Sequence, residues 1–250
     1  MPPHLGSITG AEIRAAGEGL GKGVFAIDDL PKGTIIIRES SNMKIKLDAL
    51  NNSWEFCKAY HALSEKQAWQ LNNLHCDSSK LADRLLLIAE YERWCLDRTP
   101  GVPEDRREFM TWVRHLVKAH AIYLTNCAIT PDEHAAVFNK FCRINHSCVP
   151  NTHWFITEKR GKYILEVKAN RDISFGEQIF VSYISPMEKL PERRRALDNW
   201  GFTCNCALCH AQASGDRRLA DVVWHYQKSI DNGTDFRYYT PWNRPYSQGE

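Results

Sequence analysis

Three side chains that could bind a ligand or take part in catalysis occur within the nine-residue sequence RINHSCVPN, at residues 143–151. Asn145 and His146 can hydrogen-bond or bind a ligand, and Cys148 can act as a nucleophile or a metal ligand. Three interpretations are open: a nucleophile beside its base, a metal site beside a cofactor site, or an ordinary turn. Because Asn, Ser and Pro form turns for reasons unrelated to chemistry, the turn comes first on frequency alone.

A second group of reactive side chains is formed by Cys204, Cys206 and Cys209 in the sequence CNCALC. Three thiolates this close match one side of a tetrahedral zinc site, in which sulfur lies about 2.3 Å from the metal. For the fourth ligand, His210 follows Cys209 too directly to turn back, so Cys148 is the better candidate. Free cysteines are also often simply buried, but zinc is favoured for the C-x-C-x-x-C cluster.

A glycine-rich segment, GEGLGKG at residues 17–23, precedes the apolar sequence VFAI. Ala16 stands where a phosphate-binding P-loop needs its first glycine, and Gly23 replaces the hydroxyl residue. The segment also precedes a predicted strand, whereas the glycines of dinucleotide-binding folds precede a helix. Nucleotide binding is therefore disfavoured, and the glycines either let a ligand approach the backbone or form a flexible turn.

The composition is that of an average globular protein, with 250 residues, 43% apolar and 25% charged. A net charge of +2 and a pI near 8.1 give no electrostatic case for nucleic-acid binding. No apolar run approaches a membrane span, and the first ten residues lack the layout of a signal peptide. We therefore expect a cytosolic or nuclear protein whose nine cysteines are reduced thiols or metal ligands.

The elements that would position these groups change in kind along the chain. Residues 8–40 predict strands, as do residues 152–169, around a turn at Arg160-Gly161, and the segment after Gly176. Between about residues 50 and 138 the pattern becomes helical. The apolar positions that indicate these helices are Leu81, Leu85, Ile88, Cys95, Phe109, Trp112, Val113 and Leu116.

Local signals predict where some helices begin. Ser64 with Gln67 fits a capping box, and residues 130–133 (TPDE) fit an N-cap, a first-turn proline and an acid at the third helical position. The chain is again predicted to be helical from residue 187, with a break at the cysteine cluster. Within that helix, the three arginines at 193–195 are expected to form a solvated face.

Four segments, in this order, resemble the SET-domain protein lysine methyltransferases. They are GKGVFA at 21–26, RINHSCVPN at 143–151, GEQIFVSY at 176–183 and GFTCNCALC at 201–209. The resemblance spans about residues 8–210, and the combination of N-H-S-C-x-P-N with the later tyrosine and cysteines is highly specific. Within that family, the sequence most resembles the SET and MYND group or its fungal relatives, which carry a helical insertion between the first strands and the NHSC sequence. Cys57, Cys76 and Cys95 in that insertion are widely spaced and form no C-x-x-C pair, so we expect no MYND zinc module.

The resemblance implies an α+β fold: a SET β-fold of small sheets with a pseudoknot, a helical insertion and a zinc-binding post-SET segment. The implied domains are a SET domain at 8–184 with the insertion at about 41–138, a post-SET segment at 185–212, and a C-terminal helical segment and tail at 213–250. In this family the C-terminal strand segment passes through a loop, an exception to the usual absence of knots. The sequences NHSC and VSY should therefore be neighbours.

The resemblance also implies that the methyl donor S-adenosyl-L-methionine is bound, and that one structural zinc is present. Asn126 would contact the methionine part of the cofactor, Phe202 would lie against the adenine, and Tyr183 would be the catalytic residue that orients the target amine. Phe180 and Trp200 are possible channel walls. The implied cofactor residues are Gly21, Lys22, Gly23, Asn126, Asn145, His146, Tyr183 and Phe202. The implied zinc ligands are Cys148, Cys204, Cys206 and Cys209.

The implied function is methylation of a lysine on a histone or non-histone protein. We expect a monomer in the nucleus and/or cytoplasm, with no direct binding to nucleic acid or membrane. One alternative is a catalytically silent SET module that serves as a chromatin or protein scaffold, although the intact Tyr183 argues against it. The other alternative is a cysteine hydrolase using Cys148 and His146, which is disfavoured because such pairs usually come from separate segments.

Overall fold

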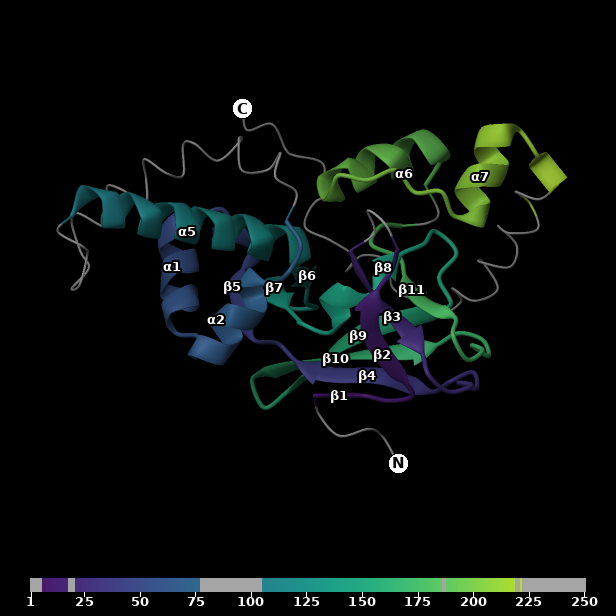
Figure 1. Ribbon diagram of the computed structural model, residues 1–250, viewed down its shortest axis with the longest axis horizontal. Helices are drawn as coiled ribbons and strands as arrows, with labels where there is room; N and C mark the ends of the chain where they lie inside the picture. The colour runs from purple at the N-terminus through teal and green to yellow at the C-terminus, as the bar shows by residue number, and fades with distance from the viewer. Residues whose placement is uncertain (1–5, 18–20, 77–104, 186–187, 219–220, 222–250) are drawn as a thin grey trace.

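The structure, a computed structural model, contains small β-sheets with a helical unit on one side and two C-terminal helices above them (Figure 1). Strands predominate near the N-terminus and in the second half of the chain, and helices in the insertion between them, as the sequence predicts. The described residues are 6–17, 21–76, 105–185, 188–218 and 221.

The first sheet has the strand order β1-β4-β10-β9, and all its neighbours are antiparallel. Its bounds are β1 Ser7–Ile8, β4 Ile35–Ser40, β9 Thr152–Lys159 and β10 Lys162–Ala169. The predicted hairpin turn is confirmed: Arg160 and Gly161 have φ values of 53° and 75°, and two consecutive left-handed residues form the turn type that matches strand twist.

The second sheet joins the segments that carry the predicted site, in the order β2-β3-β11-β8. Its bounds are β2 Ala11–Ala15, β3 Lys22–Ala26, β8 Asn145–His146 and β11 Gln178–Val181. Strand β8 pairs with β11 in parallel, with Asn145 opposite Phe180 and His146 opposite Val181. The predicted contact between NHSC and VSY is thus confirmed. Apolar residues of these first two sheets share one core, which includes Val24, Ile37, Leu165 and Ile179.

The helical insertion has its own core, built by α1, α2, α5 and a small third sheet. The predicted capping box is confirmed, because the Ser64 hydroxyl accepts from the Gln67 N–H at the start of α2 and the Gln67 side chain accepts from the Ser64 N–H. Helix α5 begins after Asp105, whose carboxylate accepts two N–H groups of the first turn. The bounds are α1 Ser53–His61, α2 Glu65–Asn72, α5 Arg106–Asn126, β5 Met43–Lys46, β6 Ala128–Ile129 and β7 His134–Val137.

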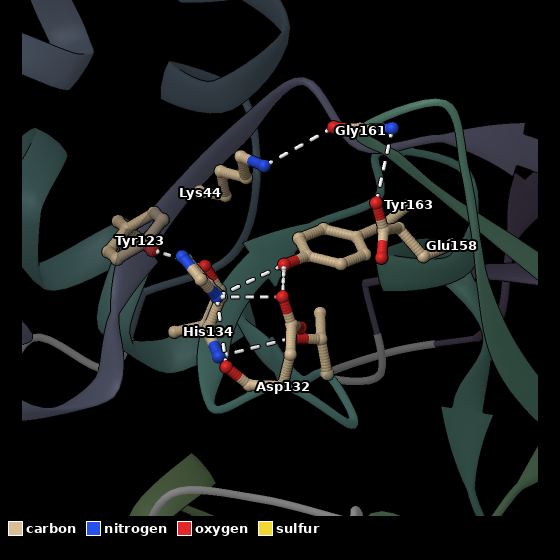
Figure 2. Close-up of polar contacts among 9 residues, drawn as sticks. Lys44, Tyr123, Asp132, His134, Glu158, Gly161 and Tyr163 are labelled. Atoms are coloured by element: carbon tan, nitrogen blue, oxygen red, sulfur yellow. Dashed lines mark hydrogen bonds and ion pairs between the residues drawn. The ribbon is translucent and has the colours of Figure 1, made fainter.

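The helix predicted to begin at Thr130 is wrong: residues 130–133 form the turn between β6 and β7. The Thr130 hydroxyl donates to the Asp132 carboxylate and accepts from the His134 N–H, and Glu133 adopts a left-handed φ of 61° that no helix start permits. Tyr163 on β10 also donates its hydroxyl to Asp132, as Figure 2 shows. The cap-forming side chains therefore stabilise a hairpin turn instead of a helix.

The C-terminal part contains α6 (Leu190–Leu197), the 3-10 helix η3 (Asp198–Trp200) and α7 (Ala207–Ser214). The prediction that all three arginines at 193–195 are solvated is wrong for Arg193, which is 0% exposed, whereas Arg194 and Arg195 are exposed. Arg193 lies one helical turn before the buried Leu197, so both side chains lie on the inner face of α6. Leu197 belongs to a third apolar cluster, formed with Ile184, Leu208 and the buried cysteines Cys148, Cys204 and Cys209.

Some predictions concern residues outside the described part of the chain. They are the apolar positions Leu81, Leu85 and Ile88, the thiol of Cys95, and most of the C-terminal segment 213–250. Of the other cysteines of the insertion, Cys57 and Cys127 are buried in its core and Cys76 packs against that core. Within the described ranges, no helix is both long enough and apolar enough to cross a membrane.

Candidate functional site

A cavity of about 400 Å³ lies where the end of α5, strands β8 and β11, the 3-10 helix η2 (Phe141–Arg143) and the residues after α6 meet. It is lined by Gly21, Lys22, His75, Thr125–Ala128, Phe141–Arg143, Asn145, His146, Trp154, Gln178, Phe180, Ser182, Tyr183 and residues 200–203. The cavity wall thus combines parts of the chain that are up to about 180 residues apart in sequence, and only the folded sheet brings them together.

Tyr183 lies just beyond β11 and faces the cavity with its ring between two apolar clusters. Its hydroxyl donates to the Ile144 carbonyl at 2.5 Å, and its ring centroid is 5.3 Å from that of Trp200. Burial, and secondarily the neighbouring Cys142 thiol, raise the pKa of Tyr183 well above its ordinary value. The hydroxyl therefore stays protonated at neutral pH, and can position a ligand without acting as a base.

His146 connects the cavity to the cysteine cluster through both of its ring nitrogens. Nδ1 accepts the main-chain N–H of Tyr183 at 3.0 Å, and Nε2 lies 3.3 Å from the Cys148 sulfur. Burial lowers the pKa of His146 to about 3, so the ring is neutral. Because Nδ1 must accept, the proton of the neutral ring is on Nε2, which donates to Cys148.

This tautomer argues against a cysteine hydrolase. A general base beside a nucleophilic thiol needs a free lone pair on the nitrogen that faces the sulfur, but Nε2 of His146 carries the proton there. Cys148 is also fully buried among other sulfur atoms. The pair formed by His146 and Cys148 is therefore built for a thiolate that accepts a hydrogen bond and is held in place.

Cys148, Cys204, Cys206 and Cys209 come together at the N-terminal end of α7, and their sulfur atoms all lie within 4.8 Å of one another. In a tetrahedral zinc site, with zinc–sulfur distances of 2.3 Å, sulfur atoms are about 3.8 Å apart. The Cys148 and Cys209 sulfurs are separated by 3.6 Å. The number, type and spacing of these donors fit one zinc ion.

The thiols of this cluster cannot all ionise independently. Hydrogen bonds among the four sulfurs, followed by burial, raise the pKa of Cys148, whereas the same hydrogen bonds lower the pKa of Cys206. Hydrogen bonds from neighbouring thiols also lower the pKa of Cys209 to about 7. Cys206 is the N-cap of α7 and Cys209 lies in its first turn, where thiolates are favoured. The cluster is thus predisposed to hold a cation.

A family model for the SET domain matches residues 21–184, which include the cavity strands and Tyr183. The chain belongs to the SET-domain family. The match includes Cys148 but ends before Cys204, Cys206 and Cys209, so the fit of the four sulfurs to zinc rests on the geometry given above.

Among curated proteins, the SET domain is similar to "Histone-lysine N-methyltransferase SET5" of Yarrowia lipolytica, 37% identical over 32% of this chain and 18% of that protein. It is also similar to "SET domain and MYND-type zinc finger protein 6" of Schizosaccharomyces pombe, 25% identical over 76% of this chain and 50% of that protein. The aligned part is thus less than a fifth of the fungal SET5 relative. A solved structure titled as the SET domain of LSMT bound to lysine and AdoHcy is 16% identical, with a TM-score of 0.42, and covers 70% of this chain and 49% of that chain.

The SET-domain structure brings most predicted cofactor residues onto one cavity wall. Gly23 is the exception, because it is buried in β3 and packs against the side-chain amide of Gln178, where an added Cβ would lie 2.5 Å from Nε2. The wall also includes the two predicted channel residues, Phe180 and Trp200. The predicted residues that line the cavity are Gly21, Lys22, Asn126, Asn145, His146, Tyr183 and Phe202. Their roles toward a cofactor stay predictions.

Sequence reasoning missed two basic side chains on the cavity wall. Arg143 donates to the Asn73 carbonyl at the end of α2, and His75 gives its own carbonyl to the Asn126 side chain. Arg143 could have been noticed because it begins the sequence RINHSCVPN. No local signal indicated His75, because its place in the wall depends on the packing of α2 against α5.

Proposed function

We propose that this chain is an S-adenosyl-L-methionine-dependent protein lysine N-methyltransferase. The observation that carries the proposal is the cavity in which Tyr183, Asn145 and Phe202 meet, in a chain of the SET-domain family. The names of the fungal relatives make a histone the first substrate to test. A non-histone protein is the second, and the chain acts in the nucleus and/or cytoplasm.

The cavity suits this cofactor because its wall offers complementary groups. Lys22 and Arg143 can face a carboxylate. The Asn126 amide nitrogen donates to the His75 and Ile122 carbonyls, both at 2.7 Å, so its oxygen is the atom it can offer to an ammonium group. His146 already uses both ring nitrogens, so we assign its cofactor contact to the main chain. Phe202 supplies an aromatic face for the adenine.

The chemical task of the protein is to present a neutral lysine amine. A free lysine has a pKa of about 10.4, so deprotonation at neutral pH costs roughly 4 to 5 kcal/mol unless the site lowers that pKa. The bound cofactor supplies a methyl group on a positively charged sulfur. The aromatic rings of Phe180 and Trp200 in the cavity wall lower access of water to the amine, which favours its uncharged form. The protonated Tyr183 hydroxyl can accept a hydrogen bond from that amine and align it.

The cysteine cluster has a structural role in this proposal. Cys148, Cys204, Cys206 and Cys209 hold one zinc ion, and His146 donates to one of its thiolates. Three of the ligands come from a post-SET segment at 185–212, and Cys148 comes from the SET domain at 8–184. In the proposed organisation the helical insertion lies at about 41–138 and a C-terminal segment at 213–250, and the chain works as a monomer.

The experiment is to incubate the chain with methyl-labelled S-adenosyl-L-methionine and either core histones or a proteome extract, followed by mapping of the modified lysines. The matched control is Tyr183→Phe, which removes one oxygen from the cavity. We expect label on specific lysines with the wild-type chain and much less with the variant. Cofactor binding by calorimetry without any transfer would support a silent scaffold instead. No cofactor binding at all would refute the proposed cavity.

A further inference from the structure

We propose that Arg193 is the counter-charge of the cysteine cluster and connects the metal site to α6 and α7. The inference rests on the proposal that the four thiols hold zinc, and it assigns a role to a residue whose sequence context suggested only a solvated surface. It makes Arg193 a positioning residue of the metal site.

The first argument is the burial of Arg193 together with the identity of its neighbours. Its guanidinium donates to the Glu188 carbonyl at 2.7 Å, to the Gln212 side-chain oxygen at 2.7 Å and to the Cys209 sulfur at 3.4 Å. Within the described ranges, no carboxylate forms an ion pair with it. A buried guanidinium without a negative partner is strongly unfavourable. The negative charge must come from the sulfur atoms.

The second argument is the charge of the cluster itself. Four protonated thiols carry no charge and would leave Arg193 uncompensated. Four thiolates around Zn²⁺ carry a net charge of −2, because four negative sulfurs exceed the two positive charges of the ion. A guanidinium that donates to one of these thiolates reduces the buried charge to −1, and a hydrogen bond to a ligating sulfur is the usual form of second-sphere support.

The third argument is the position of Arg193 between elements. The residue itself lies on α6, its partners Cys209 and Gln212 lie on α7, and Glu188 precedes α6. Helix α6 continues directly into η3, where Trp200 donates its indole N–H to the Thr125 carbonyl at the cavity wall. Arg193 therefore connects the metal site to the segment that carries the aromatic wall.

The experiment compares Arg193→Gln, which can hydrogen-bond but carries no charge, with Arg193→Lys, which keeps the charge. Arg194→Gln is the matched control, because Arg194 is the exposed neighbour on the same helix. Zinc content is measured by elemental analysis, and zinc loss is followed as transfer to a colorimetric chelator. We expect Arg193→Gln to lose zinc roughly 10- to 100-fold faster than wild type. Arg193→Lys should fall between them, and Arg194→Gln should match wild type.

The outcomes separate this inference from the proposed zinc site. If the wild-type chain contains no zinc, both fail together. If the wild-type chain contains zinc and Arg193→Gln releases it at the wild-type rate, only the role of Arg193 is wrong. Should Arg193→Gln fail to fold, Arg193→Lys decides: zinc loss as slow as in wild type or a few-fold faster supports the counter-charge. If Arg193→Lys is folded but is isolated without zinc, or releases zinc much more than a few-fold faster than wild type, the counter-charge role is overturned.

Discussion

Two polar clusters of this molecule differ in how far their side chains are exposed to water. The sulfur cluster with Arg193 is mostly buried and joins β8, α6 and α7. Asp132, His134 and Tyr163 form the second cluster (Figure 2). Its Asp132 side chain is 48% exposed, although Tyr163 is buried. The Asp132 carboxylate of the second cluster can bond to water when a partner is lost, whereas the buried groups of the first cluster cannot. Mutations should therefore have large effects at the sulfur cluster and small ones at Asp132 in the second cluster.

The largest effect is expected from Cys206→Ser, which removes one donor of the proposed zinc site. Structural zinc contributes on the order of 10 kcal/mol to organising its segment, so its loss should free Phe202 and loosen the cavity. We expect zinc to be lost, S-adenosyl-L-methionine affinity to fall at least several-fold and turnover to disappear, with little change in far-ultraviolet circular dichroism. Elemental analysis, calorimetry and methyl transfer measure these effects.

The control for that variant is Cys76→Ser, a thiol in the insertion outside the sulfur cluster. It should keep wild-type zinc content and cofactor affinity. Normal cofactor affinity and activity in Cys206→Ser would show that the sulfur cluster does not support the cavity. Burial of a cluster would then not predict how strongly its mutation affects function.

A large but more selective effect is expected from Tyr183→Phe. The change deletes the hydroxyl that donates to the Ile144 carbonyl and faces the cavity, but keeps the ring that packs against Trp200. Misalignment of the target amine should lower single-turnover methylation by roughly 100-fold. Zinc content and cofactor affinity should stay near wild type. A parallel loss of zinc would show that the two halves of the site cannot be separated in this way.

An intermediate effect is expected from Glu39→Gln. Glu39 is a buried carboxyl on β4 that accepts the N–H groups of Lys140 and Phe141 at the start of η2. Burial raises its pKa from 4.5 to about 7. A carboxyl whose folded pKa is raised stabilises the fold below the unfolded pKa and loses that contribution as pH rises through the folded pKa. The contribution lost between about pH 4.5 and 7 is up to about 3 kcal/mol.

Urea unfolding of wild type and Glu39→Gln between pH 4.5 and 8 measures this contribution. The amide cannot ionise, so the variant should gain stability relative to wild type as pH rises. Glu12→Gln on the exposed strand β2 is the control for loss of a surface charge, and its difference from wild type should stay small. A difference for Glu39→Gln that is constant with pH would mean that the carboxyl titrates alike in the folded and unfolded chain.

The sequence predicted the parts of the fold that local patterns determine. Alternating apolar residues and the Arg160-Gly161 pair gave the β9–β10 hairpin, and the Ser64 capping box gave the start of α2. The spacing of Cys204, Cys206 and Cys209 predicted one side of the sulfur cluster, and Cys148 was the better candidate for the fourth ligand. The contact between β8 and β11 was predicted from the family resemblance, since no local pattern indicates a parallel pairing.

The errors occurred where distant residues decide the structure. Thr130 and its neighbours suit a helix start as well as a turn, and the turn is selected by strands of two and four residues that are too short to detect. Tyr163, from another sheet, then completes the Asp132 cluster. Arg193 looked solvated because its partners follow 16 and 19 residues later. The buried Leu197, four residues after Arg193, was the one available signal that this face turns inward.

The smallest effect is expected from Asp132→Asn in the second cluster. Partial burial acts to raise the pKa of Asp132, but hydrogen bonds from Thr130 and Tyr163 outweigh it and lower the pKa. A lowered folded pKa means that the contribution is present at neutral pH and is lost as pH falls through the folded value. Because the carboxylate is half exposed, we expect a cost of at most about 1 kcal/mol at pH 7, which shrinks toward pH 3. Urea unfolding measures this cost, and zinc content and methyl transfer should be unchanged. If Asp132→Asn lost several kcal/mol of unfolding free energy, or lost activity, solvent exposure would not explain the different sensitivity of the two clusters to mutation.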